Sequence, residues 1–363
     1  MRTVRDLMKR GVDEGVFPGA VLLVAREGNI LFLEAFGHAR LLPERPMTTD
    51  TVFDLASLTK PLATAVSVML LIQQGRVDLD PPLGTAVAGF SDTDKRDISI
   101  RQLLSHTSGA PDYMPYYEML RDFPVSERKG ALRELLVRED LMTRPGAVCL
   151  YSDLGYMVLE WVIEVIAGMP LDLFVEKSVY KPLGLNQLFF IPLTREQVSG
   201  QYLCAATEDC PWRGKILDGE VHDDNAYALG GVAGHAGLFG TAQAVFGLLQ
   251  ELLNAYSGRP NAGLFHRDVV KVFFQRQSDV GSWALGFDTP TRPDSSSGRY
   301  FSDQSVGHLG FTGTSFWMDL EKGVIVILLT NRVHPSRANE KIKAFRPLLH
   351  DRVMETVLIC PSP

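Results

Sequence analysis

The chain has 363 residues, a length that allows one large core or two interleaved lobes. Hydrophobic residues make up 45% of it and charged residues 22%, which is typical of folded, soluble proteins and argues against the disordered, fibrous and membrane classes. A formal net charge of -7 leaves no excess of cations to neutralise phosphates. We therefore expect no nucleic-acid partner.

The cysteines and the first residues bear on the compartment. The four cysteines show no paired short spacing of the metal-ligand type, so neither a zinc site nor a disulfide scaffold is expected. The opening MRTVRDLMKRGVDEGVFPG lacks the continuous apolar run of an export signal and predicts an amphipathic surface helix. No stretch approaches the length of about 18 apolar residues that crosses a bilayer. We expect a cytoplasmic protein with no membrane partner.

Both ends of the chain are rich in predicted strands. Residues 19–37 read GAVLLVAREGNILFLEAFG, two apolar β-rich runs around a polar turn, and predict a hairpin. Residues 314–330 read TSFWMDLEKGVIVILLT and predict a second hairpin with its turn at Glu321-Lys322-Gly323.

The middle of the chain is helical in pattern. Helix-period stretches closed by glycine, in the manner of a helix C-cap, occupy 61–75, 154–168 and 171–184. A further helical segment ends at Gly258, and the last one contains Pro347. Residues 289–303 are dense in Ser, Pro and Gly and form the best candidate for a mobile loop. Strands at both ends with helices between them predict an α+β protein whose termini meet in one antiparallel sheet.

Several common functional motifs are missing from the sequence. It has no G-x-x-x-x-G-K-[ST] and no G-x-G-x-x-G after a strand, and the Gly-rich run 230–240 fits neither pattern. It also has no H-E-x-x-H and no G-x-S-x-G, which argues against a zinc protease and an α/β-hydrolase.

The pattern S-x-x-K occurs three times, at Ser57, Ser126 and Ser178, so context has to choose between them. Ser126 precedes charged residues and an amphipathic run, as an ordinary helix N-cap does. Ser178 lies within an amphipathic helix, with Lys181 expected in solvent. Ser57 differs because it leads into PLATAVSVMLLI, a stretch too apolar for an exposed helix.

Ser57 is predicted at the N-terminus of this buried helix, because Pro61 is tolerated only in a first helical turn. There the helix dipole favours the serine oxygen, and the free backbone N–H can stabilise an oxyanion. Lys60 lies three positions on and can reach the Ser57 oxygen. Burial is expected to lower the pKa of Lys60 and make it a base. A capping serine beside an unrelated lysine is the alternative.

A second element has to relay the proton, and Tyr151 offers a phenol whose ionised form a nearby Lys60 ammonium would favour. A packed aromatic side chain with no such role is the alternative for Tyr151.

A third element, His308-Leu309-Gly310, leads into the C-terminal strands. Its glycine would let a substrate lie against a strand edge while a backbone N–H points at the developing oxyanion. His235-Ala236-Gly237 has the same local shape but precedes a predicted helix without a strand edge, so it ranks lower.

Taken together, these motifs resemble those of the serine β-lactamase and penicillin-binding-protein superfamily, most closely the branch of class C β-lactamases, D-Ala-D-Ala carboxypeptidases and related esterases. The matching segments are FDLASLTKPLATA, LLSHTSGAPDY, PGAVCLYSDLGY and GHLGFTGTSFWMD, and the resemblance covers roughly residues 5–355. It implies a β-lactamase/transpeptidase-like fold. Residues 1–59 and 231–363 would form a sheet domain and 60–230 a mainly helical domain, with the active site in the cleft between them.

The same resemblance implies a role for each motif. Ser57 would be the acylated nucleophile, Lys60 and Tyr151 the shared general base and acid, and His308 the counterpart of the third-motif lysine. The backbone N–H groups of Ser57 and Phe311 would form the oxyanion hole. No metal or organic cofactor is expected.

Two positions depart from the pattern of the penicillin-recognising relatives. Asp153 stands where they carry Asn, and His308 stands where they carry Lys. Both changes reduce positive charge where a β-lactam or peptide carboxylate would lie, so efficient penicillin hydrolysis is not expected. Arg332 could restore a carboxylate anchor. The residues expected to contact the substrate are Asp153, Gly310, Phe311 and Arg332.

The sequence thus predicts a serine hydrolase, most simply of carboxylesterase type, that cleaves a small ester, amide or β-lactam-like substrate through an acyl-enzyme on Ser57. H-x-G in the third motif, as in the family's esterases and peptidoglycan-fragment amidases, favours esters or small amides. The alternative in chemistry is a D-Ala-D-Ala carboxypeptidase or peptidoglycan-fragment amidase with weak β-lactamase activity. The alternative from another class is a catalytically silent sensor or scaffold. No oligomeric state is indicated.

Overall fold

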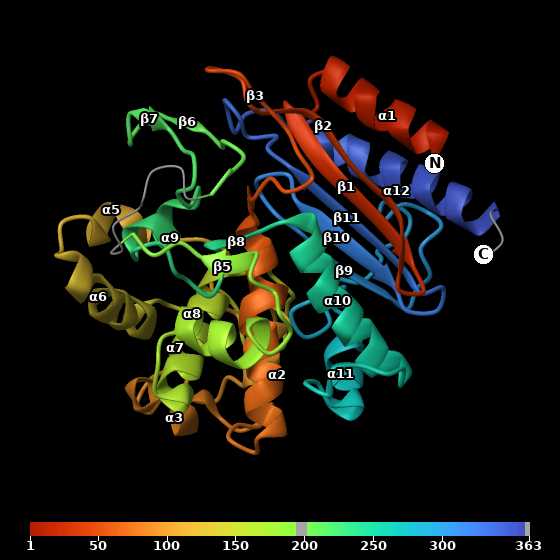
Figure 1. The fold of residues 1–363 in the computed structure, drawn as a ribbon. Helices are drawn as coiled ribbons and strands as arrows, with labels where there is room; N and C mark the ends of the chain where they lie inside the picture. The colour runs from red at the N-terminus through yellow and green to blue at the C-terminus, as the bar shows by residue number, and fades with distance from the viewer. Residues whose placement is uncertain (194–201, 360–363) are drawn as a thin grey trace.

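The computed structural model describes residues 1–193 and 202–359 and has the predicted α+β architecture (Figure 1). Its main sheet has six antiparallel strands in the order β3-β2-β1-β11-β10-β9. Their bounds are β1 (Gly19–Arg26), β2 (Asn29–Arg40), β3 (Arg45–Pro46), β9 (Ser305–Leu309), β10 (Ser315–Asp319) and β11 (Val324–Thr330).

The two predicted hairpins form the centre of this sheet. β1 pairs with β2 in the first hairpin, and β10 pairs with β11 in the second. The hairpins join where β1 pairs with β11, from Ala20 opposite Thr330 to Arg26 opposite Val324. The prediction that both termini build one antiparallel sheet is therefore confirmed.

Helices cover both faces of the main sheet. Strand side chains alternate between faces, so Leu22 and Val24 pack beneath α1 (Arg2–Asp13) and α12 (Ile342–Ile359). Figure 1 shows these two terminal helices side by side on that face. Leu23 on the opposite face belongs to the larger core, and α10 (Ala242–Ser257) contacts β1 and β11 there. The doubly covered sheet is a rigid platform for the segments at its β9 edge.

The remaining elements form a mainly helical part beside the sheet (Figure 1). Its helices are α2 (Val66–Gln73), α3 (Leu83–Ala86), α4 (Ile100–Leu104), α5 (Tyr116–Leu120), α6 (Val125–Arg138), α7 (Asp153–Ala167), α8 (Leu171–Val175) and α9 (Asp224–Ala228), with α11 (Arg267–Phe274) further along the chain. Short turns of other helix types are η1 (Ala56–Leu58), η2 (Lys60–Ala65), η3 (Ala88–Phe90) and η4 (Glu176–Tyr180). One small sheet has the strand order β4 (Phe53–Asp54), β8 (Leu238–Gly240) and β5 (Leu188–Phe190). Another consists of β6 (Asp209–Cys210) and β7 (Lys215–Ile216).

Three local predictions need correction. The helix expected over 61–75 begins as the tighter turn η1 and the wider turn η2, and regular α-helix starts only at Val66. Ser126 is not an N-cap, because Pro124 holds that position in α6. His235-Ala236-Gly237 leads directly into strand β8, so it does adjoin a strand.

Other expectations concern the loop and the domain bounds. Residues 289–303 contain neither helix nor strand, yet Ser297 and Phe301 are buried, and Arg299 binds Asp351 of α12. The mobility of this loop and the division into domains at 59/60 and 230/231 stay predictions.

Among the described residues, one helical stretch, Ala56–Gln73, is long and apolar enough to cross a membrane, and 83% of it is buried inside the protein. Burial on that scale is typical of a core helix in a soluble protein.

The central strands should dominate stability. Leu328 of β11 is fully buried, so Leu328→Ala is expected to lower the free energy of unfolding by about 2–5 kcal/mol, because it removes packed atoms and leaves a cavity. Leu31→Ala, in β2 with 38% of the residue exposed, is the matched control and should change it by only about 0.5 kcal/mol. Chemical denaturation measures both; equal losses would contradict the assignment of the core.

Candidate active site

Ser57 lies on a strained turn that aims its side chain into a cavity. The preceding Ala56 has φ 48°, a left-handed conformation that costs a non-glycine residue free energy. The Asp54 carboxylate holds this turn, since its Oδ1 accepts from the Ala56 N–H (2.8 Å) and its Oδ2 from the His222 N–H (2.6 Å). Sequence reasoning missed Asp54, which holds the turn before Ser57.

The turn is also fastened to the third motif. The Thr312 hydroxyl donates to the Asp54 carbonyl (2.8 Å), and the Thr314 hydroxyl donates to the Leu55 carbonyl (3.0 Å). A Cβ at Gly310 would collide with the Thr314 side chain and lie 2.7 Å from the Leu55 oxygen. Glycine at 310 therefore lets the chain after β9 approach the turn before Ser57 closely.

Lys60 is fully buried, and its ammonium donates to three acceptors. These are Ser57 Oγ (3.1 Å), Asp153 Oδ1 (2.7 Å) and the His235 carbonyl (3.2 Å). Three well-placed acceptors satisfy the three N–H groups of an ammonium ion. The structure thus brings Ser57, Lys60 and Asp153 together.

The protonation of Lys60 corrects a prediction. Burial does act to lower its pKa, but the Asp153 and Tyr151 side chains outweigh burial, and the net pKa of Lys60 is raised. The expectation that burial alone makes Lys60 a base was wrong, because it omitted the Asp153 counter-ion. In the resting state Lys60 is a charged hydrogen-bond donor.

Tyr151 joins the same group. Its ring lies below the Lys60 ammonium, with 4.8 Å from Nζ to the ring centroid. Burial raises the pKa of Tyr151 and outweighs the Lys60 charge, which favours the ionised form. The sequence predicted that the Lys60 ammonium lowers the pKa of Tyr151. The contribution of Lys60 has that sign, but it is smaller than the effect of burial. Tyr151 rests as a phenol.

His106, which sequence reasoning missed, holds the Tyr151 segment in place. The His106 carbonyl accepts from the Leu150 N–H (2.9 Å), and its Nδ1 accepts from the Ser152 N–H (3.0 Å). The two rings are 4.6 Å apart. These contacts on both sides of Tyr151 fix the ring against the Lys60 ammonium. The segment LLSHTSG was a signal for His106, but its partners, Leu150 and Ser152, lie more than forty residues further along the chain.

His308 of β9 also lies near Tyr151, with the ring centroids 6.0 Å apart. Its Nδ1–H donates to the Leu309 carbonyl (2.8 Å), which leaves the lone pair on Nε2. Burial and the Lys60 charge lower the pKa of His308 to about 3. The ring is therefore neutral at pH 7, as expected for this replacement of lysine.

A cavity of about 410 Å³ opens onto these groups. Its lining includes Ser57, Tyr151, Trp283, Asp288, His308, Leu309, Gly310, Phe311, Arg332, Glu340, Ile342, Lys343 and Arg346. The cavity therefore brings the predicted nucleophile, phenol and third motif to one surface.

The predicted oxyanion donors are free of internal partners. Within residues 1–193 and 202–359, no hydrogen bond uses the backbone N–H of Ser57 or of Phe311. Phe311 is 50% exposed at the cavity rim, where its ring stacks with the Arg332 guanidinium at 4.6 Å.

Arg332 is less available than the sequence suggests. It is only 6% exposed, and it donates to the carbonyls of Phe311 (2.8 Å), Arg337 (3.0 Å) and Asn339 (2.6 Å). Three of its five N–H groups are thus occupied, and those on Nη2 are left to face a ligand.

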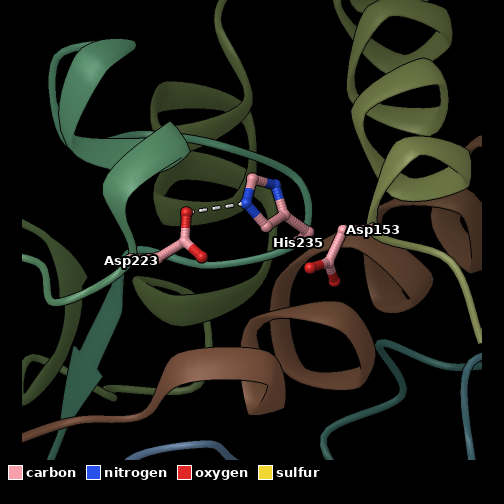
Figure 2. Close-up of side chains that lie close together, drawn as sticks. All are labelled: Asp153, Asp223 and His235. Carbon is pink, nitrogen blue, oxygen red and sulfur yellow. Dashed lines mark hydrogen bonds and ion pairs between the residues drawn. The ribbon is translucent and has the colours of Figure 1, made fainter. Parts of the chain in front are cut away.

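Asp153, Asp223 and His235 lie close together, with ligand atoms within 4.8 Å of one another (Figure 2). His235 Nε2 is 2.9 Å from Asp223 Oδ1. Burial disfavours both charged forms, but their attraction raises the pKa of His235 and lowers that of Asp223. A metal would compete with these bonds and be repelled by Lys60, so the cluster fits a network of ion pairs better.

In the other two S-x-x-K motifs, the lysines form ion pairs with glutamates. Lys129 binds Glu164 (2.5 Å), and Lys181 binds Glu176 (2.9 Å) on the surface. Among the described residues, neither lysine donates to the serine three positions before it.

The fold and this serine–lysine–tyrosine arrangement define a β-lactamase-like serine hydrolase. Residues 4–348 match the family described as Beta-lactamase, and the chain belongs to that family.

Named relatives and solved structures agree with this family assignment. The chain is 33% identical over 354 residues to a protein of Escherichia coli (strain K12) named "Putative D-alanyl-D-alanine carboxypeptidase", covering 89% of this chain and 80% of that protein. Its structure is similar to SurE, with 26% identity, a TM-score of 0.75 and coverage of 100% of this chain and 78% of that one. It shares the fold of EstCE1, a hydrolase with promiscuous acyltransferase activity, at 24% identity and a TM-score of 0.74, covering 95% and 98% of the two chains. The chain is an enzyme of the serine hydrolase class, in a family that acts on small ester, amide or β-lactam substrates.

The Lys60–Asp153 ion pair should set the pH dependence. Both Lys60 and Tyr151 have raised pKa values, so a base appears only as pH rises, and kcat/KM for a small p-nitrophenyl ester should increase through the alkaline range. Asp153→Asn removes the anion that raises the pKa of Lys60. The alkaline rise should move to lower pH by about one unit or more. Asp122→Asn, at an exposed aspartate, should leave the profile unchanged. An unshifted profile in Asp153→Asn would contradict this role of the ion pair.

Proposed function

We propose that this protein is a carboxylesterase-type hydrolase that cleaves a small ester or amide through an acyl-enzyme on Ser57. The observation that carries the proposal is the contact between Lys60 Nζ and Ser57 Oγ at the wall of the catalytic cavity, with the Tyr151 ring centroid 4.8 Å from the same Nζ. A nucleophile, a proton carrier and an open cavity at one point are what acyl transfer needs.

The proton path follows from the resting protonation. Lys60 and Tyr151 are both protonated in the resting state. The pair becomes a base when it loses one of these protons. That base takes the Ser57 proton while Oγ forms a bond to the substrate carbonyl carbon. The N–H groups of Ser57 and Phe311 stabilise the oxyanion. The pair then returns the proton to the leaving alcohol or amine, and water releases the acyl group by the same steps.

The charge of the site favours esters and small amides over penicillins. His308 is neutral, and Asp153 places a carboxylate where an amide would serve a penicillin side chain. Arg332 retains free N–H groups on Nη2 alone for a carboxylate. Asp153, Gly310, Phe311 and Arg332 are the substrate contacts that we propose.

A D-Ala-D-Ala carboxypeptidase or peptidoglycan-fragment amidase is the second candidate. The name of the Escherichia coli relative supports it. So does the cationic part of the cavity, Arg332, Lys343 and Arg346, which suits a substrate carboxylate. Release of D-alanine from a peptide that ends in D-Ala-D-Ala, without turnover of short esters, would favour this function. A silent sensor or scaffold would give neither reaction.

The cytoplasm is the compartment that we propose. The free thiols of Cys149, Cys204 and Cys210 support it, because reduced cysteines are typical of a reducing compartment.

Covalent labelling tests the nucleophile. The native protein is expected to gain the mass of one fluorophosphonate adduct, because the probe acylates an activated serine, and Ser57→Ala should gain none. Ser126→Ala, which alters another S-x-x-K serine, is the matched control and should label like the native protein. Intact-mass spectrometry with peptide mapping measures the adduct. An adduct that persists in Ser57→Ala would show that another residue is the nucleophile, and a native protein inert to every acylating probe would favour the silent scaffold.

A further inference from the structure

One carboxylate in the catalytic cavity has no counter-ion. Among the cations that line the cavity, Lys343 binds Glu340 at 2.7 Å, while Arg332 and Arg346 donate to backbone carbonyls. Asp288 lines the same cavity, yet no lysine, arginine or histidine of the described chain lies within ion-pair distance of it. Its charge is therefore available to a ligand.

The fold holds Asp288 rigidly at the open edge of β9. Its backbone pairs with Gly307 in both directions, with N···O distances of 2.8 and 2.9 Å. Its Oδ1 accepts from the Ser282 hydroxyl (2.6 Å) and the Thr289 N–H (2.9 Å). Among the described residues, nothing donates to its second oxygen, Oδ2. One oxygen is thus anchored and the other is left free.

This arrangement is costly without a ligand. Burial raises the pKa of Asp288 to about 6, so the side chain is still mainly ionised at pH 7. Arg276, the cation that acts on it electrostatically, donates to Thr289 Oγ1 and the Pro290 carbonyl instead. Asp288 is half-buried, and its two neutral donors do not balance its charge, as a bound cation would. Perturbed groups of this kind in a cleft are typical of functional sites.

An aromatic residue, Trp283, lies next to Asp288 in the cavity lining. Trp283 pairs with Asp288 in a backbone bridge and lines the same cavity. Its ring centroid is 5.3 Å from both Tyr151 and His308, so the indole lies beside the catalytic groups. A carboxylate and an indole that line one cavity are a favourable environment for an ammonium ion, through charge and cation–π attraction.

We propose that Asp288 and Trp283 form a subsite for an ammonium group, and that the enzyme acts on small esters or amides that carry a free amine. The inference rests on the proposed hydrolase function and names its substrate class. The cationic residues Arg332, Lys343 and Arg346 line the same cavity and repel an amine, so Asp288 is where the amine binds.

Matched substrates test the subsite. The methyl esters of alanine, 4-aminobutanoic acid and 6-aminohexanoic acid place the amine at increasing distance from the carbonyl, and each is compared with its N-acetylated form at pH 7. At least one free-amine ester should exceed its acetylated form in kcat/KM by about 10- to 100-fold, the range expected for a charged hydrogen bond. Asp288→Asn should abolish this preference by lowering kcat/KM for the free-amine ester to about that of its acetylated form.

Two further variants separate binding from folding. Asn at 288 keeps an Oδ1 acceptor for Ser282 and Thr289, and thermal unfolding shows whether the variant is folded. Asp279→Asn, at an exposed position on the same loop, is the matched control and should retain the preference. Trp283→Phe should reduce it severalfold, because phenylalanine is a weaker cation–π partner.

The outcomes distinguish this inference from the proposed function. Turnover of esters with no preference for the free amine, or a preference that Asp288→Asn retains, would overturn the ammonium subsite alone. A folded protein that turns over none of the esters and shows no Ser57 labelling would overturn both.

Discussion

The site depends on one buried cation. The Lys60 ammonium is fully enclosed and reaches acceptors from three separate segments: the turn that carries Ser57, the start of α7 and the loop before β8. A buried ammonium is tolerated only with paired charge and complete hydrogen bonding. Asp153 supplies the charge, and Ser57 and the His235 carbonyl complete the bonding. The same contacts that make the cation tolerable therefore fix the position of Ser57, the proposed nucleophile.

The terminal sheet makes this convergence possible. β1 joins β11, so the first residues of the chain and the strands that follow His308 form one rigid layer. Thr312 and Thr314, between β9 and β10, then hold the turn before Ser57 by its carbonyl oxygens. The third motif is hydrogen-bonded directly to the turn before Ser57. The strained conformation of Ala56 is therefore maintained by long-range contacts rather than by the local sequence.

Local patterns predicted the hairpins, the α+β class and the spacing of Ser57, Lys60, Tyr151 and His308, because periodicity and short motifs are properties of neighbouring residues. They did not reveal Asp54, His106 or Asp288, whose partners come from distant segments. The pKa of Lys60 was predicted with the wrong sign for the same reason. Its counter-ion lies 93 residues away, and its effect exceeds the burial that the apolar helix indicated.

The two departures from the penicillin-recognising pattern change what a substrate encounters. The charge of Asp153 is neutralised within the protein by Lys60, and His308 carries no charge at pH 7. Neither motif residue then offers a net charge to the cavity. Lys343 pairs with Glu340, whereas Arg332 and Arg346 donate to backbone carbonyls, which leaves Asp288 as the lining carboxylate that forms an ion pair with no described side chain. Selectivity by charge should accordingly come from the strand edge next to the motifs, because the motif residues neutralise one another.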